Sequence, residues 1–502
     1  MALGIKVQTG EVPGSAGTST STGTAFIMGE AEWGPYTPLL VKSMAQFTES
    51  YGVRSAVNGK LYDAVETFFQ LEGAQCYVLR LQEAAKASKQ AQPTGFELVT
   101  TGAKKAVSVE ARYAGTYINE WTLEVVKKAA ESANIVLKNA AGEVIEETGY
   151  LAGAENLPWP ASGATEFSTA YLTFKQLAAY TANKTVQLET LAAVKMKTAQ
   201  AGTNPTIAES DAEAAPALFP KTLGPGQLCY PGTSSFSVAE KVHKAMGESA
   251  LKTNRVALCD IADSATVATL ISNKKTYTNN IAGYMAFFSS SVVIPGITLG
   301  TTRTVAASAV AAGLCAQAAK SGNDCAAPAG VQWSQAGQGL SPFVSGFTNT
   351  FSNENMSTLA ENGINPFAER QGKPVLYDFV SALLRSTDRI FCQFSASRER
   401  MHLVWAGEEI AEGFLFKTID GRGQLIAGFQ GALMGMLLEQ WKANAIFGKT
   451  APEAGLVNVG EPVNTPTTVS EGQLNAELKV RLSPYVESMS LVIISVPVTE
   501  NV

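Results

Sequence analysis

Histidine is almost absent from this 502-residue chain, which contains only His243 and His402. A metal site or general base built on either imidazole would need partners from distant parts of the chain. The sequence also has no G-x-x-x-x-G-K-[ST] phosphate loop, no G-x-G-x-x-G after an apolar strand and no G-x-S-x-G nucleophile motif. These absences predict a chain that is not an enzyme and that has no catalytic residue, cofactor or metal site.

Charge and long apolar runs are scarce as well. Only 16% of the residues are charged, and the net charge of −6 lacks the basic excess that direct binding of nucleic acid requires. The nearest candidate for a membrane span, Leu425 to Leu438, is 14 residues long and contains Gln430, so no membrane insertion is expected. The N-terminus has no basic stretch followed by an apolar core, and a signal peptide is therefore not predicted.

The six cysteines are scattered and form no C-x-x-C pair. We expect them to be small buried thiols in a reducing compartment. His402 falls in a helical pattern with Arg398 and Glu399, and we expect it to be a packed or solvated helical residue.

What the sequence does contain is a strand pattern at each end. Near the N-terminus apolar residues alternate with polar ones or glycine, and Ser15 to Thr24, which has no large side chain, reads as a flexible tether. Near the C-terminus an uncharged strand carries two apolar faces, and Pro497 places it at a sheet edge or end. An unpaired apolar strand invites association, so each end pairs within its own domain or with another molecule. The residues concerned are Leu3, Ile5 and Val7, and Leu491, Val492, Ile493, Ile494, Val496 and Val498.

Between the ends the pattern is α/β. Helices are predicted at 43–52, 60–73, 374–387, 398–412 and 422–445, and buried strands at 75–81, 253–261 and 389–396. The glycines between Gly421 and Gly431 fall inside a helical pattern, so we expect them to allow close helix packing.

Five segments together resemble contractile tail sheath proteins, in the family's order and over most of the chain. They are 23–81 with "GTAFIMGEAEWGP", 111–126 with "ARYAGTYINEWTLEVV", 303–317 with "RTVAASAVAAGLCAQ", 424–446 with "QLIAGFQGALMGMLLEQWKANAI" and 472–493 with "GQLNAELKVRLSPYVESMSLVI". The family's "WGARTL" and Arg-Arg helix have no counterpart between Gly363 and Arg400, and its Gly-Asn is Ile118-Asn119 here. The chain thus resembles a divergent member.

This resemblance implies a multidomain, mixed α/β (α+β) fold, with a core domain formed by both chain ends, nested inserted domains and extended N- and C-terminal β-arms. The expected parts are an N-terminal arm and tether (1–22), a second domain in two pieces (23–92 and 229–359), an outward-facing insertion (93–228), the sheath core domain (360–489) and a C-terminal arm strand (490–502).

The resemblance also implies a structural subunit that polymerises as stacked hexameric rings around a tail tube and contracts to drive the tube through a target cell envelope. The arms would add strands to a neighbour's sheet, received at Leu474, Ala476, Leu478 and Val480. Expected partners are further copies of the chain and the tail tube, baseplate and tail terminator proteins. The expected location is the contractile tail of a virion or a related injection device, assembled in the host bacterial cytoplasm. An alternative is another self-assembling shell or surface protein, such as an adhesin, that is not an enzyme.

Overall fold

The computed structural model describes residues 22–487 except 84–88, 91, 93–96, 100–104, 130–131, 152–156, 158–163, 179, 181–189, 233–235, 262, 265, 332–339 and 341–342. Its contacts separate two compact units. The first comprises Met1–Ile27, Ala64–Tyr77 and Phe219–Val502, and the second comprises Met28–Asp63 and Val78–Leu218.

An eight-stranded sheet has the strand order β19-β18-β14-β13-β12-β1-β3-β2. Neighbours from β1 through β12, β13 and β14 to β18 run parallel, and β19 is antiparallel to β18. Strands β1, β3, β12, β13 and β14 are buried at every residue, as expected for parallel strands covered on both faces. Their bounds are β1 Ala25–Gly29, β2 Leu39–Val41, β3 Cys76–Arg80, β12 Gln227–Cys229, β13 Val256–Asp260, β14 Met285–Ser289, β18 Ile364–Arg370 and β19 Lys373–Leu376.

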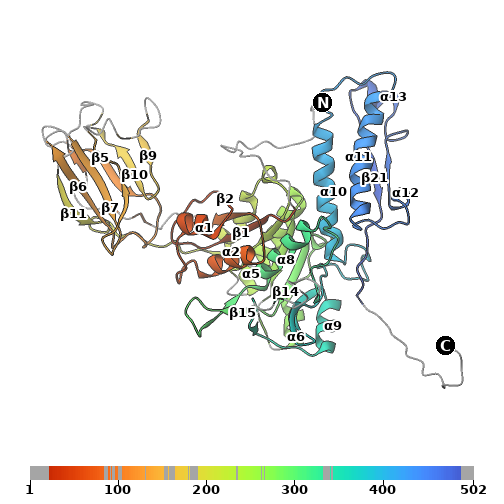
Figure 1. Ribbon diagram of the computed structural model, residues 1–502, viewed down its shortest axis with the longest axis horizontal. Coiled ribbons are helices and arrows are strands. Elements are labelled where there is room, and N and C mark those ends of the chain that lie inside the picture. Colours follow the sequence, from red (N-terminus) through yellow and green to blue (C-terminus); the bar gives the residue numbers. More distant parts are fainter. Residues whose placement is uncertain are drawn as a thin grey trace. The chain divides into compact units, whose positions relative to one another are not determined.

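Helices α5 (Phe236–Thr253) and α8 (Ala307–Lys320) pack against β13 in the first unit (Figure 1). Shorter helices α6 (Val267–Asn273), α7 (Asn279–Ala282) and α9 (Asn353–Glu361) lie between the later strands of the sheet in sequence. A separate three-stranded sheet has the order β16-β15-β17. Its strands are β15 Val292–Pro295, β16 Thr302–Val305 and β17 Gly346–Phe347.

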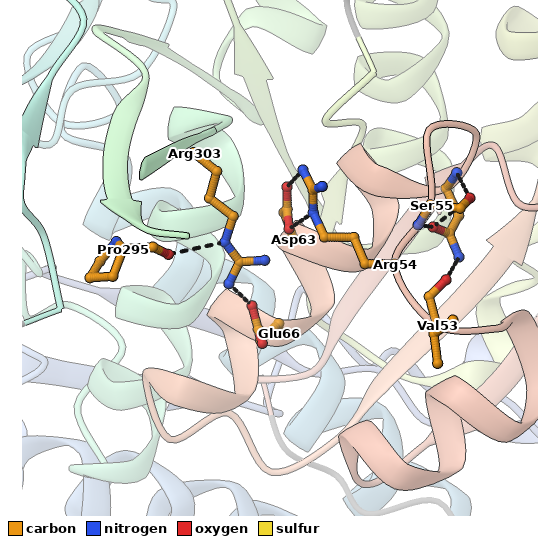
Figure 2. A network of polar contacts seen from close by, with 8 residues as sticks. Val53, Arg54, Ser55, Asp63, Glu66, Pro295 and Arg303 are labelled. Atoms are coloured by element: carbon orange, nitrogen blue, oxygen red, sulfur yellow. Dashed lines mark hydrogen bonds and ion pairs between the residues drawn. The ribbon is translucent and has the colours of Figure 1, made fainter. Parts of the chain in front are cut away.

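The predicted helices near the N-terminus are confirmed as α1 (Met44–Tyr51) and α2 (Gly59–Gln70). The Ser43 hydroxyl accepts a hydrogen bond from Gln46 N at 3.2 Å, and Gly52 ends the helix with φ of 93°. Before α2, Arg54 binds Asp63 with two hydrogen bonds of 2.8 Å (Figure 2). The strands predicted at 75–81 and 253–261 are confirmed as β3 and β13.

The second unit contains two four-stranded sheets with the orders β4-β5-β10-β9 and β11-β6-β7-β8 (Figure 1). Alternate residues such as Val107, Val109, Leu123 and Val125 point into a shared core, which is the two-residue period of half-buried strands. The strands are β4 Glu97–Val99, β5 Lys105–Ala111, β6 Thr122–Ala129, β7 Ser132–Lys138, β8 Val144–Glu147, β9 Glu166–Ser168, β10 Leu172–Gln176 and β11 Leu191–Lys195. Helix α4 (Glu209–Ala214) and the 3-10 turns η2 (Ala215–Leu218) and η3 (Lys221–Leu223) follow in sequence.

The two long helices predicted near the C-terminus are confirmed as α10 (Phe394–Glu412) and α11 (Gln424–Lys442), which run side by side (Figure 1). They are followed by α12 (Ala451–Ala454), β20 (Gly455–Asn458), α13 (Pro466–Ser470) and β21 (Glu477–Val480). Strands β20 and β21 form an antiparallel pair.

Three predictions from the sequence are wrong. The helix at 374–387 is absent because Gln371 and Gly372, both at positive φ, turn the chain back so that β19 pairs with β18. The strand at 389–396 is absent because the Asp388 carboxylate accepts from the next backbone N–H groups and α10 then begins at Phe394. The flexible tether does not extend to its predicted end, because Thr22 and Thr24 are buried.

The mixed α/β class is confirmed. All six cysteines are buried free thiols, as predicted. Across the part of the chain that the structure describes, no helix combines the length and the apolar character needed to cross a bilayer.

Candidate assembly interface

The face of α11 opposite to solvent carries a small hydrophobic core of its own. Phe429, Leu433, Met436 and Leu437 project from the helix and pack with Val457 of β20. The four residues predicted as the receiving sheet, Leu474, Ala476, Leu478 and Val480, are half-buried against this same core. Their spacing of two residues puts them on one face of β21 and of the segment before it, so α11 supports the strand from below.

Strand β21 has a neighbour on one side only among the described residues, because its sheet has two strands. Arg481 N donates to Ala454 O at 2.9 Å, Phe447 N donates to Arg481 O at 2.7 Å, and Ser483 N donates to Ala445 O at 3.0 Å. The backbone groups of 481 and 483 thus face β20 and the chain beside it. Since successive residues of a strand point their backbone groups to opposite sides, those of Leu478 and Val480 face the open edge.

The chain that leaves β21 is anchored where the predicted C-terminal arm starts. The Tyr485 hydroxyl lies 3.0 Å from Asp378 Oδ1 and 2.9 Å from Phe379 O. Glu487 accepts from Gln393 Nε2 at 2.8 Å and pairs with Arg385. Burial, reinforced by the charge of Asp378, holds the pKa of Tyr485 well above its usual range, so its hydroxyl stays a donor. A cavity of 440 Å³ adjoins this anchor and is lined by Arg385, Ser386, Arg389, Cys392, Gln393 and Glu487.

The first described residue is anchored as well. Thr22 Oγ1 donates to Asp324 Oδ2 at 2.6 Å, and Arg398 Nη2 donates to Asp324 Oδ1 at 2.7 Å. Both carboxylate oxygens of Asp324 therefore have a buried partner. Burial alone would raise the pKa of Asp324, but the Arg398 charge and the hydrogen bonds from His402 and Thr22 outweigh it and hold the pKa below its usual range.

His402 connects the buried cluster of Thr22, Asp324 and Arg398 to α11. Its Nδ1 lies 3.4 Å from Asp324 Oδ2, and its Nε2 lies 2.9 Å from Gln440 Nε2. A neutral imidazole protonated on Nδ1 satisfies both contacts. Burial lowers the pKa of His402, but the hydrogen bond and charge of Asp324 outweigh burial, so the pKa is raised.

Glu399 is the unusual member of the cluster. Its side chain is 0% exposed, and neither carboxylate oxygen has a hydrogen-bond partner among the described residues. Burial, followed by the nearby charge of Asp324, raises its pKa to about 7, against the lowering effects of His402 and Arg398. A buried carboxyl without a partner is far less costly as the neutral acid.

Sequence reasoning missed this cluster. It expected His402 to be packed or solvated and assigned no role to Arg398 or Glu399. No local pattern connects Thr22 to Asp324, since 302 positions separate them. The one available signal was the run of small and apolar residues, Phe394 to Ser397, that leads α10 into the buried interior.

The prediction that the α11 glycines allow close helix packing is wrong within the subunit. A Cβ placed on Gly421, Gly423 or Gly431 would meet nothing within 4 Å, and one on Gly428 would meet Phe414 only at an ordinary 3.6 Å. Gly423 instead precedes α11 at φ of 74°, where glycine is favoured. Gly431 leaves part of the exposed face of α11 without side chains.

The tip of the β15–β16 hairpin exposes apolar side chains: Ile297 is 65% exposed and Leu299 101%. The strand ends next to this tip are held in place (Figure 2): Arg303 pairs with Glu66 of α2, and Arg303 Nε donates to Pro295 O at 3.3 Å.

The remaining predicted arm residues, Leu3, Ile5, Val7, Leu491, Val492, Ile493, Ile494, Val496 and Val498, lie outside the described residues, so their pairing stays a prediction. Within the described ranges, no group of three His, Cys, Asp or Glu side chains is placed to hold a metal ion. What the geometry offers, within the residues that the structure describes, is a supported strand with an open edge and an anchored root for each terminal segment.

A scan against protein-family models gives no match. A sequence search of curated proteins gives none either. Solved structures, in contrast, match over nearly the whole chain. The sheath tail protein of Listeria innocua is 13% identical with a TM-score of 0.58 over 92% of this chain and 96% of that chain. The sheath tail protein of Desulfitobacterium hafniense is 11% identical with a TM-score of 0.53 over 91% and 93%.

The helical sheath of the anti-feeding prophage in its contracted state is 13% identical with a TM-score of 0.55, and the match covers 98% of this chain and 99% of that chain. A match that spans both chains from end to end compares whole architectures and not one shared module. The chain therefore has the fold of contractile tail sheath proteins.

Proposed function

We propose that this chain is the structural subunit of a contractile tail sheath. In this proposal, copies polymerise as stacked hexameric rings around a tail tube, and contraction drives the tube through a target cell envelope without any catalytic step. The observation that carries the proposal is the end-to-end fold match to a helical sheath. Further copies, the tube, and baseplate and tail terminator proteins are the partners of such a subunit, in a virion or injection device assembled in the host bacterial cytoplasm.

Strand addition by the terminal arms is the proposed link between subunits. The open edge of β21 supports this proposal, because an incoming strand obtains affinity from backbone hydrogen bonds and specificity from alternate side chains. A two-stranded hairpin is only marginally stable by itself, and further strands would complete a sheet on α11. The anchored positions Thr22 and Tyr485 keep each arm tied to its own subunit.

The first experiment uses the full chain and two truncations that lack residues 1–12 or 490–502. Negative-stain microscopy of the full chain is expected to show long hollow cylinders, and both truncations are expected to remain folded monomers with unchanged circular dichroism. Cylinders of normal length from either truncation would contradict the arm model. Discrete particles from the full chain would contradict the sheath itself.

A second experiment tests the receiving edge. Ala476→Pro removes a backbone donor on the open side of the strand, where proline is tolerated, whereas Lys479→Pro removes one on the side of β20. We expect A476P to melt like the wild type but to form no cylinders, and K479P to lower the melting temperature. An A476P chain that assembles normally would show that this edge is not used.

A further inference from the structure

One buried carboxylate binds two segments that lie far apart in the sequence, one of which is the first described residue. Asp324 accepts from Thr22 Oγ1 at 2.6 Å and from Arg398 Nη2 at 2.7 Å. Thr22 and Asp324 are each 4% exposed, and Arg398 is 0% exposed. We name these three residues the Asp324 clamp. It joins the root of the N-terminal segment to the second turn of α10.

The clamp is itself fixed to the helices around it. Arg398 Nη2 also donates to Cys315 O of α8 at 2.8 Å. Next to Asp324, Asn323 Nδ2 donates to Ala443 O at the end of α11, at 2.9 Å. Asp324 therefore lies in a loop that is hydrogen-bonded to α8 and to α11. A displacement of Thr22 that moves Asp324 would also disturb these two helices.

We propose that Asp324 is the positioning residue that transmits tension on the N-terminal segment to α10 and, through His402 and Gln440, to α11. The proposal rests on the proposed function, in which that segment links one subunit to another. A tether that ended in a mobile loop would absorb the pull, whereas a root held by a buried charged acceptor passes it to the helices. The clamp thus couples the N-terminal segment, which is the proposed link between subunits, mechanically to α10 and α11.

Thr22→Val tests the clamp because valine keeps the shape of the side chain and removes only the donor. Thr67→Val is the matched control, since the Thr67 hydroxyl is also buried but has no partner among the described residues. Hydrogen exchange is measured on the peptide that covers Thr22–Thr24 in the monomer. Loss of a hydrogen bond to a charged acceptor is expected to speed exchange there about tenfold or more in T22V, with no change in T67V. Equal exchange in all three proteins would overturn the clamp.

The transmission of tension is tested on assembled cylinders. T22V cylinders are expected to fragment under shear at which wild-type and T67V cylinders stay intact. If T22V exchanges faster but its cylinders resist shear as the wild type does, the clamp exists and transmits nothing, and the proposal is overturned. If the wild type forms no cylinders, the proposed function fails and takes the transmission with it, while exchange in the monomer still decides whether the clamp forms.

Discussion

Arg398 and Asp324 lie 74 positions apart and meet at 2.7 Å, with side chains 0% and 5% exposed. Breaking one half of such a pair leaves the other as an uncompensated buried charge, which costs about 3–5 kcal/mol. We therefore expect Arg398→Met and Asp324→Asn each to lower the free energy of unfolding in urea by about that amount. The double variant should lose less than the sum, by about 1–3 kcal/mol, because neither charge is then stranded.

The control for this double-mutant cycle is an exposed ion pair that also joins a positive to a negative side chain. Lys244 and Glu248 lie 3.8 Å apart with side chains 64% and 59% exposed. Lys244→Met should change the unfolding free energy by less than about 0.5 kcal/mol. Additive effects of R398M and D324N would mean that the two side chains do not interact.

Glu399 predicts a specific pH dependence. Because burial raises its pKa from 4.5 to about 7, the folded state binds a proton more tightly than the unfolded state. Its contribution to stability is complete below about pH 4.5 and falls as the pH rises to about 7, by about 3 kcal/mol in total. Glu399→Gln cannot ionise, so the difference in unfolding free energy between E399Q and the wild type should grow over this range.

His402 and Asp324, which lie beside Glu399, also make the free energy of unfolding depend on pH, and the direction of each effect follows from its pKa shift. The raised pKa of His402 gives stability that is present at acid pH and lost as the pH rises through its folded value. The lowered pKa of Asp324 gives stability that is present above its unfolded value and lost on acidification below it. The Asp324 effect falls at more acid pH than that of Glu399, whereas the Glu399 charge itself helps to raise the pKa of His402, so part of the His402 effect is removed together with Glu399 in E399Q. A pH-independent difference between the two proteins would refute the buried acid.

Two helical glycines should respond to alanine in opposite directions. A Cβ on Gly313 of α8 would lie 2.6 Å from Leu71 Cβ, whereas one on Gly431 of α11 meets nothing within 4 Å. Gly431→Ala should stabilise the monomer by about 1 kcal/mol through helix propensity. Gly313→Ala should destabilise it despite the same propensity gain, because the crowded neighbour must move. Thermal unfolding measures both, and two stabilising substitutions would mean that α8 and Leu71 are not in close contact.

Tyr485→Phe removes the hydroxyl that binds Asp378 and Phe379 O. The loss of a buried hydrogen bond to a carboxylate should cost about 1.5–3 kcal/mol. Hydrogen exchange at residues 483–487 should rise in the monomer while exchange in β13 stays slow. Unchanged exchange at 483–487 would show that Tyr485 does not anchor this segment.

Capping residues and apolar periodicity predicted the helices and strands that are determined by interactions between residues close in sequence. Ser43 and Gly52 bound α1 as a cap and a stop, and the apolar residues 75–81 form β3, because hydrogen bonding and burial within a short window decide both. The same rules failed at 374–387, where a helical spacing of apolar residues lost to a tight turn at Gln371 and Gly372 and to pairing with β18. A turn three residues upstream outweighed the periodicity of the segment.

For the candidate interface, the resemblance named a receiving sheet at Leu474, Ala476, Leu478 and Val480. These side chains pack on the α11 core, and whether they receive a strand stays a prediction. The Asp324 clamp was out of reach for such reasoning, because an isolated Asp in a loop and an Arg in a helix have no pattern that joins them. Only the folded arrangement shows that Glu399 lies beside them with no hydrogen-bond partner among the residues that the structure describes.

The Asp324 clamp also fixes an order of events during synthesis. Thr22 precedes Asp324 by 302 positions, and Arg398 follows later still. The ribosome has to make α10 before the clamp can close, and long loops close slowly. The first described residue therefore gains its complete anchor only after every strand of the eight-stranded sheet has been made.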